Sequence, residues 1–503
     1  MNRTIVNFFR RRRDIFLSRN FLLAFLVLIG GYIVFNNLGA NPLSTDSYIY
    51  ANISQSMIRN HDFVTMTFVD KPFFGDSKGI LLYWLSAISG EILGFNSFSM
   101  RLPAAILCFS CILFMFFILE KQYNYIFAFV SSGVLLLTQQ FLYHARSLLP
   151  DGIFAVFFAF SAASFYFAVS KNKSAYYYLF GLFLALSVLI RQSLGLMVLP
   201  VVFCYALSLK ERKKVFTDKH LYFSCLLATF LVLPWYVAAY KMYGEVFLKE
   251  YLATPYKILT GASGTGSPFV GSQWHTYVNI LAANYEPWLI FAMIGIFFSA
   301  KKILKEKSLF GVSFEKFTLI WALLPLLLVH FLKGHQYYFI VPIYIPLAIL
   351  STFGIYKFFK NKNAVVITFI FIILLFAILC AFKLLPKTLD ARHHIYSVEL
   401  IPAMTAIKEP IYTTGRPKFY SSIFEFFTGR RVIGAYNPYD NSVEIEDANE
   451  KGLSDEDFDR MMRSGKKYFF LSYRDYFEEK VSGKYKVNII AETNEDILFS
   501  NQF

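Results

Sequence analysis

The chain has 503 residues, of which 56% are hydrophobic, 19% are aromatic and only 17% are charged. Soluble globular proteins carry about 25% charged residues, so this composition excludes an ordinary soluble enzyme, a disordered protein and a disulfide-rich secreted domain. The 49 Lys and Arg residues outnumber the 34 Asp and Glu residues and give a formal net charge of +15. The basic residues lie in short segments between apolar runs, which indicates a multi-span membrane protein and argues against nucleic-acid binding.

Apolar stretches of about 17–22 residues match a bilayer core about 30 Å thick. The basic N-terminus leads into such a stretch with no small-residue cleavage site, so we expect a retained first span. The sequence predicts an α-helical polytopic protein with about 11–13 transmembrane helices. The spans that we identify lie near residues 21–39, 101–119, 125–143, 153–170, 176–190, 194–209, 221–240, 287–300, 317–332, 337–358 and 364–383.

The orientation follows from the short basic loops, which all fall on one side of these spans. By the positive-inside rule that side is the cytoplasm, which also holds the N-terminus. An odd number of spans then places the C-terminus outside. The segments expected on the outer face are 40–100, 144–152, 241–286 and 333–336.

Two of these outer segments are long. Segment 40–100 contains amphipathic patterns at Tyr48–Arg59 and Leu81–Leu93, which predict helices lying in the membrane interface. Segment 241–286 contains the glycine-rich run 261–268, which we interpret as part of a lid-like loop. A phosphate cradle is the alternative for this run, but it does not join a strand to a helix as a nucleotide-binding loop does.

The composition changes after about residue 385. Short apolar runs at Lys467–Leu471, Tyr485–Ile490 and Ile497–Ser500 predict strands, and Ser454–Arg463 predicts a helix. We therefore predict a transmembrane domain over residues 1–385 and a soluble α/β domain over residues 386–503, outside the membrane. The five cysteines lie in apolar runs and indicate packing.

Ionisable residues at a membrane boundary are costly and mark candidate functional sites. The outer face collects two acids at separate loop–helix junctions, several basic residues and two further acids. These residues are Asp46, Lys71, Asp76, Lys78, His144, Arg146, Asp151, Arg191, Glu286, Lys333 and His335. The cations can hold the phosphate of a lipid-borne substrate through charge-assisted hydrogen bonds, and an acid can remove a hydroxyl proton.

Structural roles compete with these functional ones. Asp46 and Asp151 each follow a loop and are good helix caps. Lys78 can extend its ammonium to the interface from an apolar surface. For Arg191 and His335 both kinds of role stay open.

Two motifs carry a resemblance to a known family. The segment Asp46-Ser-Tyr-Ile-Tyr-Ala-Asn-Ile-Ser54 places an acid ahead of a tyrosine after the first span, and Ser77-Lys78-Gly79-Ile-Leu-Leu-Tyr83-Trp84 follows. Over about residues 1–385 the pattern resembles the GT-C superfamily of polyprenyl-phosphate-sugar glycosyltransferases, in particular the lipid A aminoarabinose transferase and protein O-mannosyltransferase-like family. The second motif of that family is Glu-Lys-Pro-(x)3-Tyr-Trp. Here a serine replaces the glutamate and a glycine the proline, so a metal site would depend on Asp76.

Further residues match the family in order along the chain. Asp151 resembles its second acid, and Pro234-Trp235-Tyr236 resembles the entry to its outer loop. Lys257 falls roughly where relatives carry a phosphate-binding arginine. The stretch from Lys333 to Pro346, which contains Tyr337, resembles the family's Lys-Leu-Pro-His-Tyr segment.

The resemblance implies a glycosyltransferase of the bacterial inner membrane that moves a monosaccharide from undecaprenyl phosphate to lipid A or a related envelope lipid on the periplasmic face. A periplasmic protein hydroxyl is the alternative acceptor, and a flippase for a lipid-linked sugar is the alternative function. The implied catalytic residues are Asp46 and Asp151. The implied substrate- and phosphate-binding residues are Lys78, Tyr83, Arg146, Arg191, Lys257, Lys333, His335 and Tyr337. The resemblance identifies no certain cofactor, and the use of a divalent metal stays open.

Overall fold

The computed structural model describes residues 17–40, 43–68, 71–74, 78–260, 276–305, 311–332, 336–381, 400–409, 411–414, 432–433, 455–493 and 496–502. The chain forms two compact units. The first consists of residues 1–38, 77–82 and 101–390, and the second of residues 39–76, 83–100 and 391–503. The boundary predicted near residue 385 lies outside the described residues.

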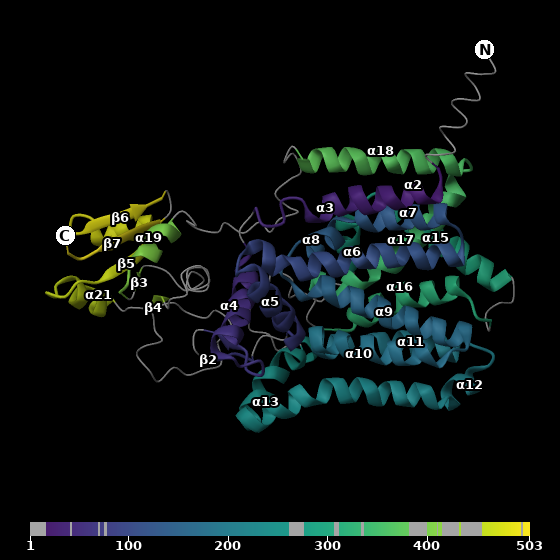
Figure 1. Cartoon of the computed structure of the whole chain (residues 1–503), viewed down its shortest axis with the longest axis horizontal. Helices are drawn as coiled ribbons and strands as arrows, with labels where there is room; N and C mark the ends of the chain where they lie inside the picture. Colours follow the sequence, from purple (N-terminus) through teal and green to yellow (C-terminus); the bar gives the residue numbers. More distant parts are fainter. Residues whose placement is uncertain are drawn as a thin grey trace, which may run out of the picture. The chain divides into compact units, whose positions relative to one another are not determined.

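The first unit is a bundle of long helices, and Figure 1 shows several of them running side by side. Among the described residues, six helices are long and apolar enough to cross a membrane, or eight if two bent pairs each count as one span. The elements are α2 (Arg19–Phe25), the π-helical turn η1 (Leu26–Gly30), α3 (Gly31–Phe35), α6 (Ser97–Gln122), α7 (Tyr125–Leu136), α8 (Gln139–Ala145), α9 (Pro150–Lys171), α10 (Ser174–Gly195), α11 (Val198–Leu207), α12 (Arg212–Thr217), α13 (Lys219–Thr260), α14 (Thr276–Asn284), α15 (Trp288–Lys305), α16 (Phe314–His330), the 3₁₀ turn η3 (Tyr337–Ile343), α17 (Tyr344–Phe358) and α18 (Lys362–Ala381).

Helices coincide with all eleven predicted spans, so the predicted α-helical polytopic architecture is confirmed. The number of crossings stays a prediction, because the spans near 21–39, 194–209 and 317–332 fall on helices shorter than 18 residues. The spans near 125–143 and 287–300 fall on the two bent pairs. The chain turns by 73° between α7 and α8 and by 118° between α14 and α15.

The helices of this unit differ strongly in burial. The most apolar window of α9 is 83% buried inside the protein, and that of η3 with α17 is 89% buried. The corresponding window of α13 is only 17% buried. A helix that is apolar on all sides suits either a protein core or a lipid environment. Helix α9 and the segment formed by η3 and α17 therefore lie at the centre of the bundle, and α13 presents its apolar surface outwards.

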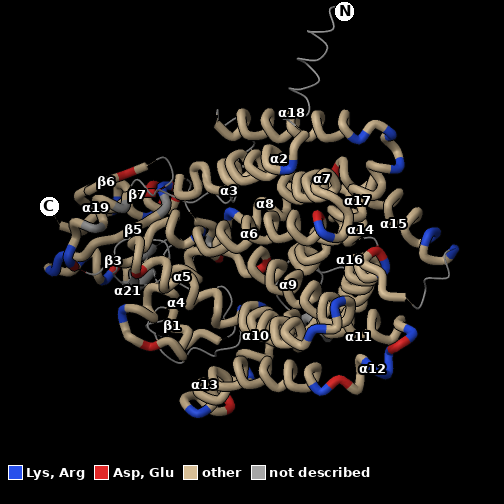
Figure 2. The backbone as a smooth tube through the Cα atoms, turned by 45° about the vertical axis from the view of Figure 1, so that its right-hand side comes forward, with Lys and Arg blue, Asp and Glu red and all other residues tan. Residues whose placement is uncertain are grey.

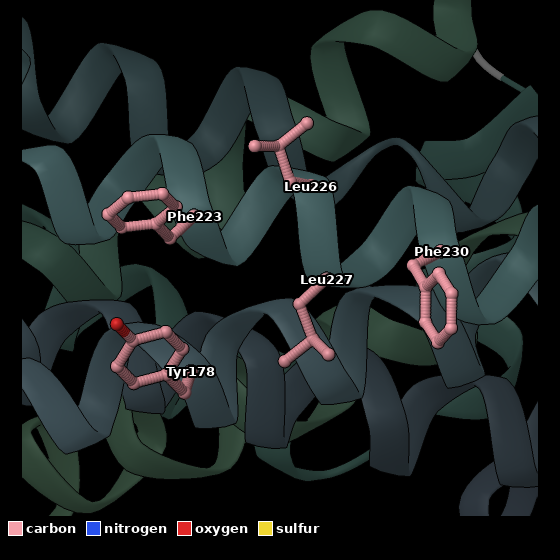
Figure 3. Close-up of a pocket in the computed structure, with 5 residues that line it drawn as sticks. All are labelled: Tyr178, Phe223, Leu226, Leu227 and Phe230. Atoms are coloured by element: carbon pink, nitrogen blue, oxygen red, sulfur yellow. The ribbon is translucent and has the colours of Figure 1, made fainter.

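Charges are sparse along the long helices and gather towards helix ends and connecting segments (Figure 2). An open apolar groove between α10 and α13 is lined by Tyr178, Phe223, Leu226, Leu227 and Phe230 (Figure 3). These five lining residues carry no charge. The groove therefore suits contact with lipid chains and offers no chemistry for catalysis.

Helix α13 is longer than the predicted span 221–240. It continues to Thr260 with one break at Gly244, whose φ of 58° favours glycine. The ring of Tyr251 lies 5.3 Å from that of Trp235, although a straight helix would separate residues 16 positions apart by about 24 Å. The chain therefore folds back at Gly244. Within the segment 241–286, residues 241–260 and 276–284 are helical, and the run 261–268 lies outside the described residues. The placement of this segment outside the membrane stays a prediction.

The second unit contains two helices that were predicted from amphipathic patterns. They are α4 (Thr45–Asn60) and α5 (Ile80–Leu93), of which α5 begins in the first unit. The short strands β1 (Thr67–Phe68) and β2 (Lys71–Pro72) pair antiparallel between them. The Tyr50 ring on α4 lies 6.0 Å from the Tyr83 ring on α5, and both side chains are buried. Packing between these aromatic residues fixes the two helices against each other.

The C-terminal part of this unit is a small mixed α/β domain, as predicted. Its five strands follow the order β4-β3-β5-β7-β6, with β3 parallel to β4 and β5, and β7 antiparallel to β5 and β6. The elements are α19 (Ile401–Ala406), β3 (Ile411–Thr414), β4 (Val432–Ile433), α21 (Asp455–Met462), β5 (Phe469–Tyr473), α22 (Arg474–Tyr476), the π-helical turn η6 (Phe477–Val481), β6 (Asn488–Glu492) and β7 (Asp496–Ser500). Hydrogen bonds from Tyr485 and Lys484 lower the pKa of Asp459 on α21 below its usual value.

Candidate functional site

A buried ion pair joins the start of α9 to α10. Pro150 is the first residue of α9, and Asp151 follows it. The Asp151 Oδ1 atom accepts a hydrogen bond from Arg191 Nε at 3.0 Å and forms an ion pair with Arg191 Nη2, also at 3.0 Å. The Asp151 and Arg191 side chains are only 4% and 3% exposed. The N-cap position of α9 is Leu149, so the alternative that Asp151 is the N-cap is wrong. The two ions can coexist in this environment because each neutralises the other.

Arg191 lies at a break within α10. The backbone of Arg191 has φ −138° and ψ 26°, and that of Gln192 has φ 45° and ψ −126°. The positive φ of Gln192 costs about 1–3 kcal/mol in a residue other than glycine, so the surrounding structure has to hold it there. The Arg191 guanidinium also lies 4.8 Å from the centre of the Tyr338 ring, which favours a cation. The break occurs where the sequence analysis divided α10 from the next span.

The residue that follows Lys78 fits tightly against this break. The Gly79 N–H donates a hydrogen bond to the Ile190 carbonyl at 2.9 Å. A Cβ atom on residue 79 would lie 1.9 Å from the Leu189 carbonyl oxygen, so no side chain fits there. Proline, which the related motif has at this position, would also lack the N–H donor. Glycine in place of proline at residue 79 therefore permits the close backbone contact that holds the half-buried Lys78 beside the break.

Two further polar residues lie near the ion pair. The sequence analysis named His144 among the outer-face candidates without a specific role, and it did not name Gln192. His144, at the end of α8, is completely buried, and Gln192 is 4% exposed. In the described part of the chain, neither the ring nitrogens of His144 nor the amide atoms of Gln192 have a hydrogen-bond partner. The sequence contains His144 in an outer-face segment, but nothing in it reveals that the side chain is unpaired. Gln192 gives no signal, because its positive φ is a property of the fold.

Arg146 caps a helix end. Its Nη1 atom donates to the carbonyl oxygens of Ile33, Val34 and Asn36 at 2.9, 3.0 and 2.9 Å, and the side chain is buried. These carbonyls lie at the carboxyl end of α3, where helical partners are lacking. This contact gives Arg146 a structural role, and its binding to a phosphate stays a prediction. Tyr337 begins η3, and its ring lies 6.3 Å from that of His144.

Asp46 lies in the first turn of α4, in the second unit. The N-cap of this helix is Ser44, whose hydroxyl accepts a hydrogen bond from the Ser47 N–H at 3.4 Å. The alternative that Asp46 is the N-cap is therefore wrong. A carboxylate in the first turn still benefits from the positive end of the helix dipole. Tyr83, in the same unit, packs on Tyr50 as described above.

Four remaining candidates lie wholly or partly outside the described residues. Asp76, Lys333 and His335 lie outside the described residues, and Lys257 lies in α13 with a side chain that is not described. Within the described ranges, no group of three or more His, Cys, Asp or Glu side chains is placed to hold a metal ion. A metal site that involves Asp76 stays a prediction.

The long helical bundle, followed by a small mixed sheet, is the fold of the GT-C membrane glycosyltransferases. The crystal structure of ArnT from Cupriavidus metallidurans bound to undecaprenyl phosphate matches 96% of this chain and 98% of that chain, with a TM-score of 0.74 and 14% identity. The apo oligosaccharyltransferase of Archaeoglobus fulgidus matches 91% of this chain and 70% of that chain, with a TM-score of 0.55 and 14% identity. The chain is thus a multi-pass membrane protein with this fold.

Sequence comparisons lead to the same group of proteins. Residues 77–237 match the family described as dolichyl-phosphate-mannose-protein mannosyltransferase. The chain is 26% identical over 330 residues to the undecaprenyl phosphate-alpha-4-amino-4-deoxy-L-arabinose arabinosyl transferase of Shewanella sediminis, over 65% of this chain and 58% of that protein. The protein of the same name from Enterobacter sp. strain 638 is 26% identical over 61% of this chain and 54% of its own length. The chain spans little more than half the length of these relatives. The resemblance inferred from the sequence is confirmed.

Proposed function

We propose that this chain is an integral-membrane glycosyltransferase that moves one monosaccharide from an undecaprenyl-phosphate carrier to lipid A or a related envelope lipid. The reaction takes place on the periplasmic face of a bacterial inner membrane, with the N-terminus in the cytoplasm and the C-terminal domain in the periplasm. The names of the curated relatives support the carrier and the transfer of a sugar. The ArnT structure of the same fold, which contains undecaprenyl phosphate, supports the carrier as well.

The observation that carries this proposal is the buried Asp151–Arg191 ion pair beside the backbone of Lys78 and Gly79. Ionisable groups inside an apolar bundle are costly, and they persist where a function needs them. The pair does not cap α9, so helix capping does not account for it. We assign the carrier phosphate to Lys78, whose ammonium can form charge-assisted hydrogen bonds to phosphate oxygens.

In the proposed reaction, the bond between the anomeric carbon of the sugar and the carrier phosphate oxygen breaks, and undecaprenyl phosphate leaves with the electron pair. A new bond forms between the anomeric carbon and an acceptor oxygen. The cations near the leaving phosphate stabilise its developing charge, which is the largest electrostatic contribution expected in such a site. On the resemblance alone, we assign a substrate-binding role to Lys257, Lys333, His335, Tyr83 and Tyr337.

The role of Asp46 depends on the acceptor. A phosphate of lipid A is already anionic and needs no base, so Asp46 would orient the donor sugar. A sugar or serine hydroxyl has to lose a proton, and Asp46 would then accept it as a general base. A protein hydroxyl is the second candidate acceptor, because the family that matches residues 77–237 is described as a protein mannosyltransferase.

The proposal is tested with the full-length protein in lipid vesicles that contain a radiolabelled undecaprenyl-phosphate sugar. We expect label in lipid A when that acceptor is supplied, and we expect the mass of lipid A in cells to shift when the protein is present. Label on a protein hydroxyl would identify the second candidate. Movement of the intact donor between leaflets without a new glycosidic bond would refute transfer and identify a flippase.

A further inference from the structure

Four residues with buried polar side chains lie at the break in α10 or next to residues that contact it. Asp151 and Arg191 form the ion pair, and Gln192 follows Arg191 directly in the chain. His144 lies close by, because the backbone of Gly152, next to Asp151, packs against it: a Cβ on Gly152 would lie 2.8 Å from the His144 carbonyl oxygen. All four side chains are less than a tenth exposed. The group therefore belongs to the interior of the first unit.

The charges in this group are already balanced. Asp151 accepts a hydrogen bond from Arg191 Nε and forms an ion pair with Arg191 Nη2, and the guanidinium also faces the Tyr338 ring. An ammonium group needs an acid that is not already neutralised, and beside Arg191 it would meet a like charge in a poorly solvated place. The carboxylate of Asp151 is therefore unsuited to an amino sugar.

The other two side chains have hydrogen-bonding capacity to offer. A glutamine amide has donors and an acceptor, and a neutral imidazole has one of each. Neither His144 nor Gln192 has a hydrogen-bond partner among the described residues. Buried polar groups are normally paired, so we expect a bound ligand to supply the missing hydrogen-bond partners of both side chains. Sugar hydroxyls both donate and accept, and they match this combination without bringing a charge.

We propose that the donor carries a neutral, hydroxyl-bearing sugar and that His144 and Gln192 bind its hydroxyl groups. This inference rests on the proposed function, because it requires a donor phosphate held near Lys78. The backbone contact between Gly79 and Ile190 keeps Lys78 at the break that contains Gln192. A phosphate on Lys78 and the sugar attached to it can thus be held by neighbouring parts of the first unit.

The first experiment compares donors that differ in one group. The full-length protein in nanodiscs is titrated with undecaprenyl phosphate that carries arabinose, 4-amino-4-deoxyarabinose, glucose, mannose or no sugar, and displacement of a fluorescent undecaprenyl phosphate is measured. We expect at least one neutral donor to bind about tenfold or more tightly than the amino donor and the sugar-free carrier. Equal or tighter binding of the amino donor than of every neutral donor would overturn the inference.

The second experiment removes the hydrogen-bonding groups. We expect His144→Phe and Gln192→Met each to abolish the preference for the neutral donor and to leave the affinity for sugar-free carrier unchanged. His220→Phe is the matched control, because His220 contacts Tyr178 at the other end of α10. Retention of the preference in both variants would contradict the assignment. If one variant fails to accumulate, the other decides, and the comparison of donors needs no variant.

The outcomes separate this inference from the proposed function. Preferential binding of a neutral donor without transfer to any acceptor would refute the glycosyltransferase and support the sugar site. Efficient transfer from the amino donor, with slower transfer from every neutral donor, would support the glycosyltransferase and overturn the inference.

Discussion

Breaking the Asp151–Arg191 ion pair is the sharpest perturbation that the structure suggests. Both side chains are nearly inaccessible to solvent, so the partner that stays behind cannot be compensated by water. Removing one member of a buried pair costs about 3–5 kcal/mol. At about 1.4 kcal/mol per tenfold change, this corresponds to roughly two to four powers of ten in the folding equilibrium. We expect this loss of stability for Asp151→Leu and for Arg191→Met.

The double variant separates stability from function. Replacing both members of a buried pair by apolar residues of similar volume is often neutral, or stabilising by about 1–4 kcal/mol. We therefore expect Asp151→Leu combined with Arg191→Met to recover most of the stability that each single variant loses. Because we propose that the carrier phosphate binds to Lys78 beside this pair, we expect sugar transfer by the double variant to stay at least about tenfold below that of the unaltered protein.

Thermal unfolding of the purified variants in nanodiscs, together with transfer from a labelled donor, measures both quantities. The matched control is the Lys302–Glu315 pair, with 2.9 Å between its charged atoms and a lysine that is 50% exposed. Breaking such an exposed pair costs about 1 kcal/mol or less. Single variants at Asp151 or Arg191 that lose no more stability than Lys302→Met would refute the buried pair. Normal transfer by the double variant would show that the pair serves stability alone.

Three other predictions concern Asp46 in the first turn of α4, and Lys78 and Gly79 directly before α5. Asp46→Asn should abolish transfer while the protein still inserts and folds, and normal product in a complementation assay would contradict this role. Lys78→Ala should weaken the binding of undecaprenyl phosphate much more than Lys121→Ala, because we expect Lys121 to face the cytoplasm; equal affinities in a fluorescence titration would exclude Lys78 as the phosphate ligand. Gly79→Ala should destabilise the protein by about 1–3 kcal/mol, since its Cβ would overlap the Leu189 carbonyl oxygen; an unchanged unfolding temperature would mean that the two backbones are farther apart.

Apolar runs were sufficient to locate the helices, because a membrane span has to be both long and apolar. They could not predict where a helix bends. The fold-back of α13 at Gly244 depends on aromatic contacts between residues far apart along that helix. A single glycine just beyond an apolar run does not reveal such a turn. Short apolar runs likewise predicted β5, β6 and β7, whereas the strand order depends on long-range pairing.

The candidate site was predicted in part. The sequence marked Asp151 and Arg191 as costly charges at the membrane boundary, but their direct contact across 40 positions is a property of the tertiary structure. Arg146 matched the same pattern of outer-face cations, yet its guanidinium is bound to the end of a helix. Charge and position in a sequence identify residues that need a partner. They do not say whether that partner is a ligand, another side chain or a backbone carbonyl.

The caps at the end of α3 have a consequence for the order of biosynthesis. The carboxyl end of this helix and the turn after it receive hydrogen bonds from Arg146 and from Arg101, whose Nη1 donates to the Leu38 carbonyl at 2.8 Å. These donors lie up to 113 positions farther along the chain. At a synthesis rate of about 5–20 residues per second, the ribosome needs roughly 5–20 s to produce them. Helix α3 therefore leaves the ribosome before these carbonyl groups have their partners, and its final docking has to wait for the segment that carries Arg146.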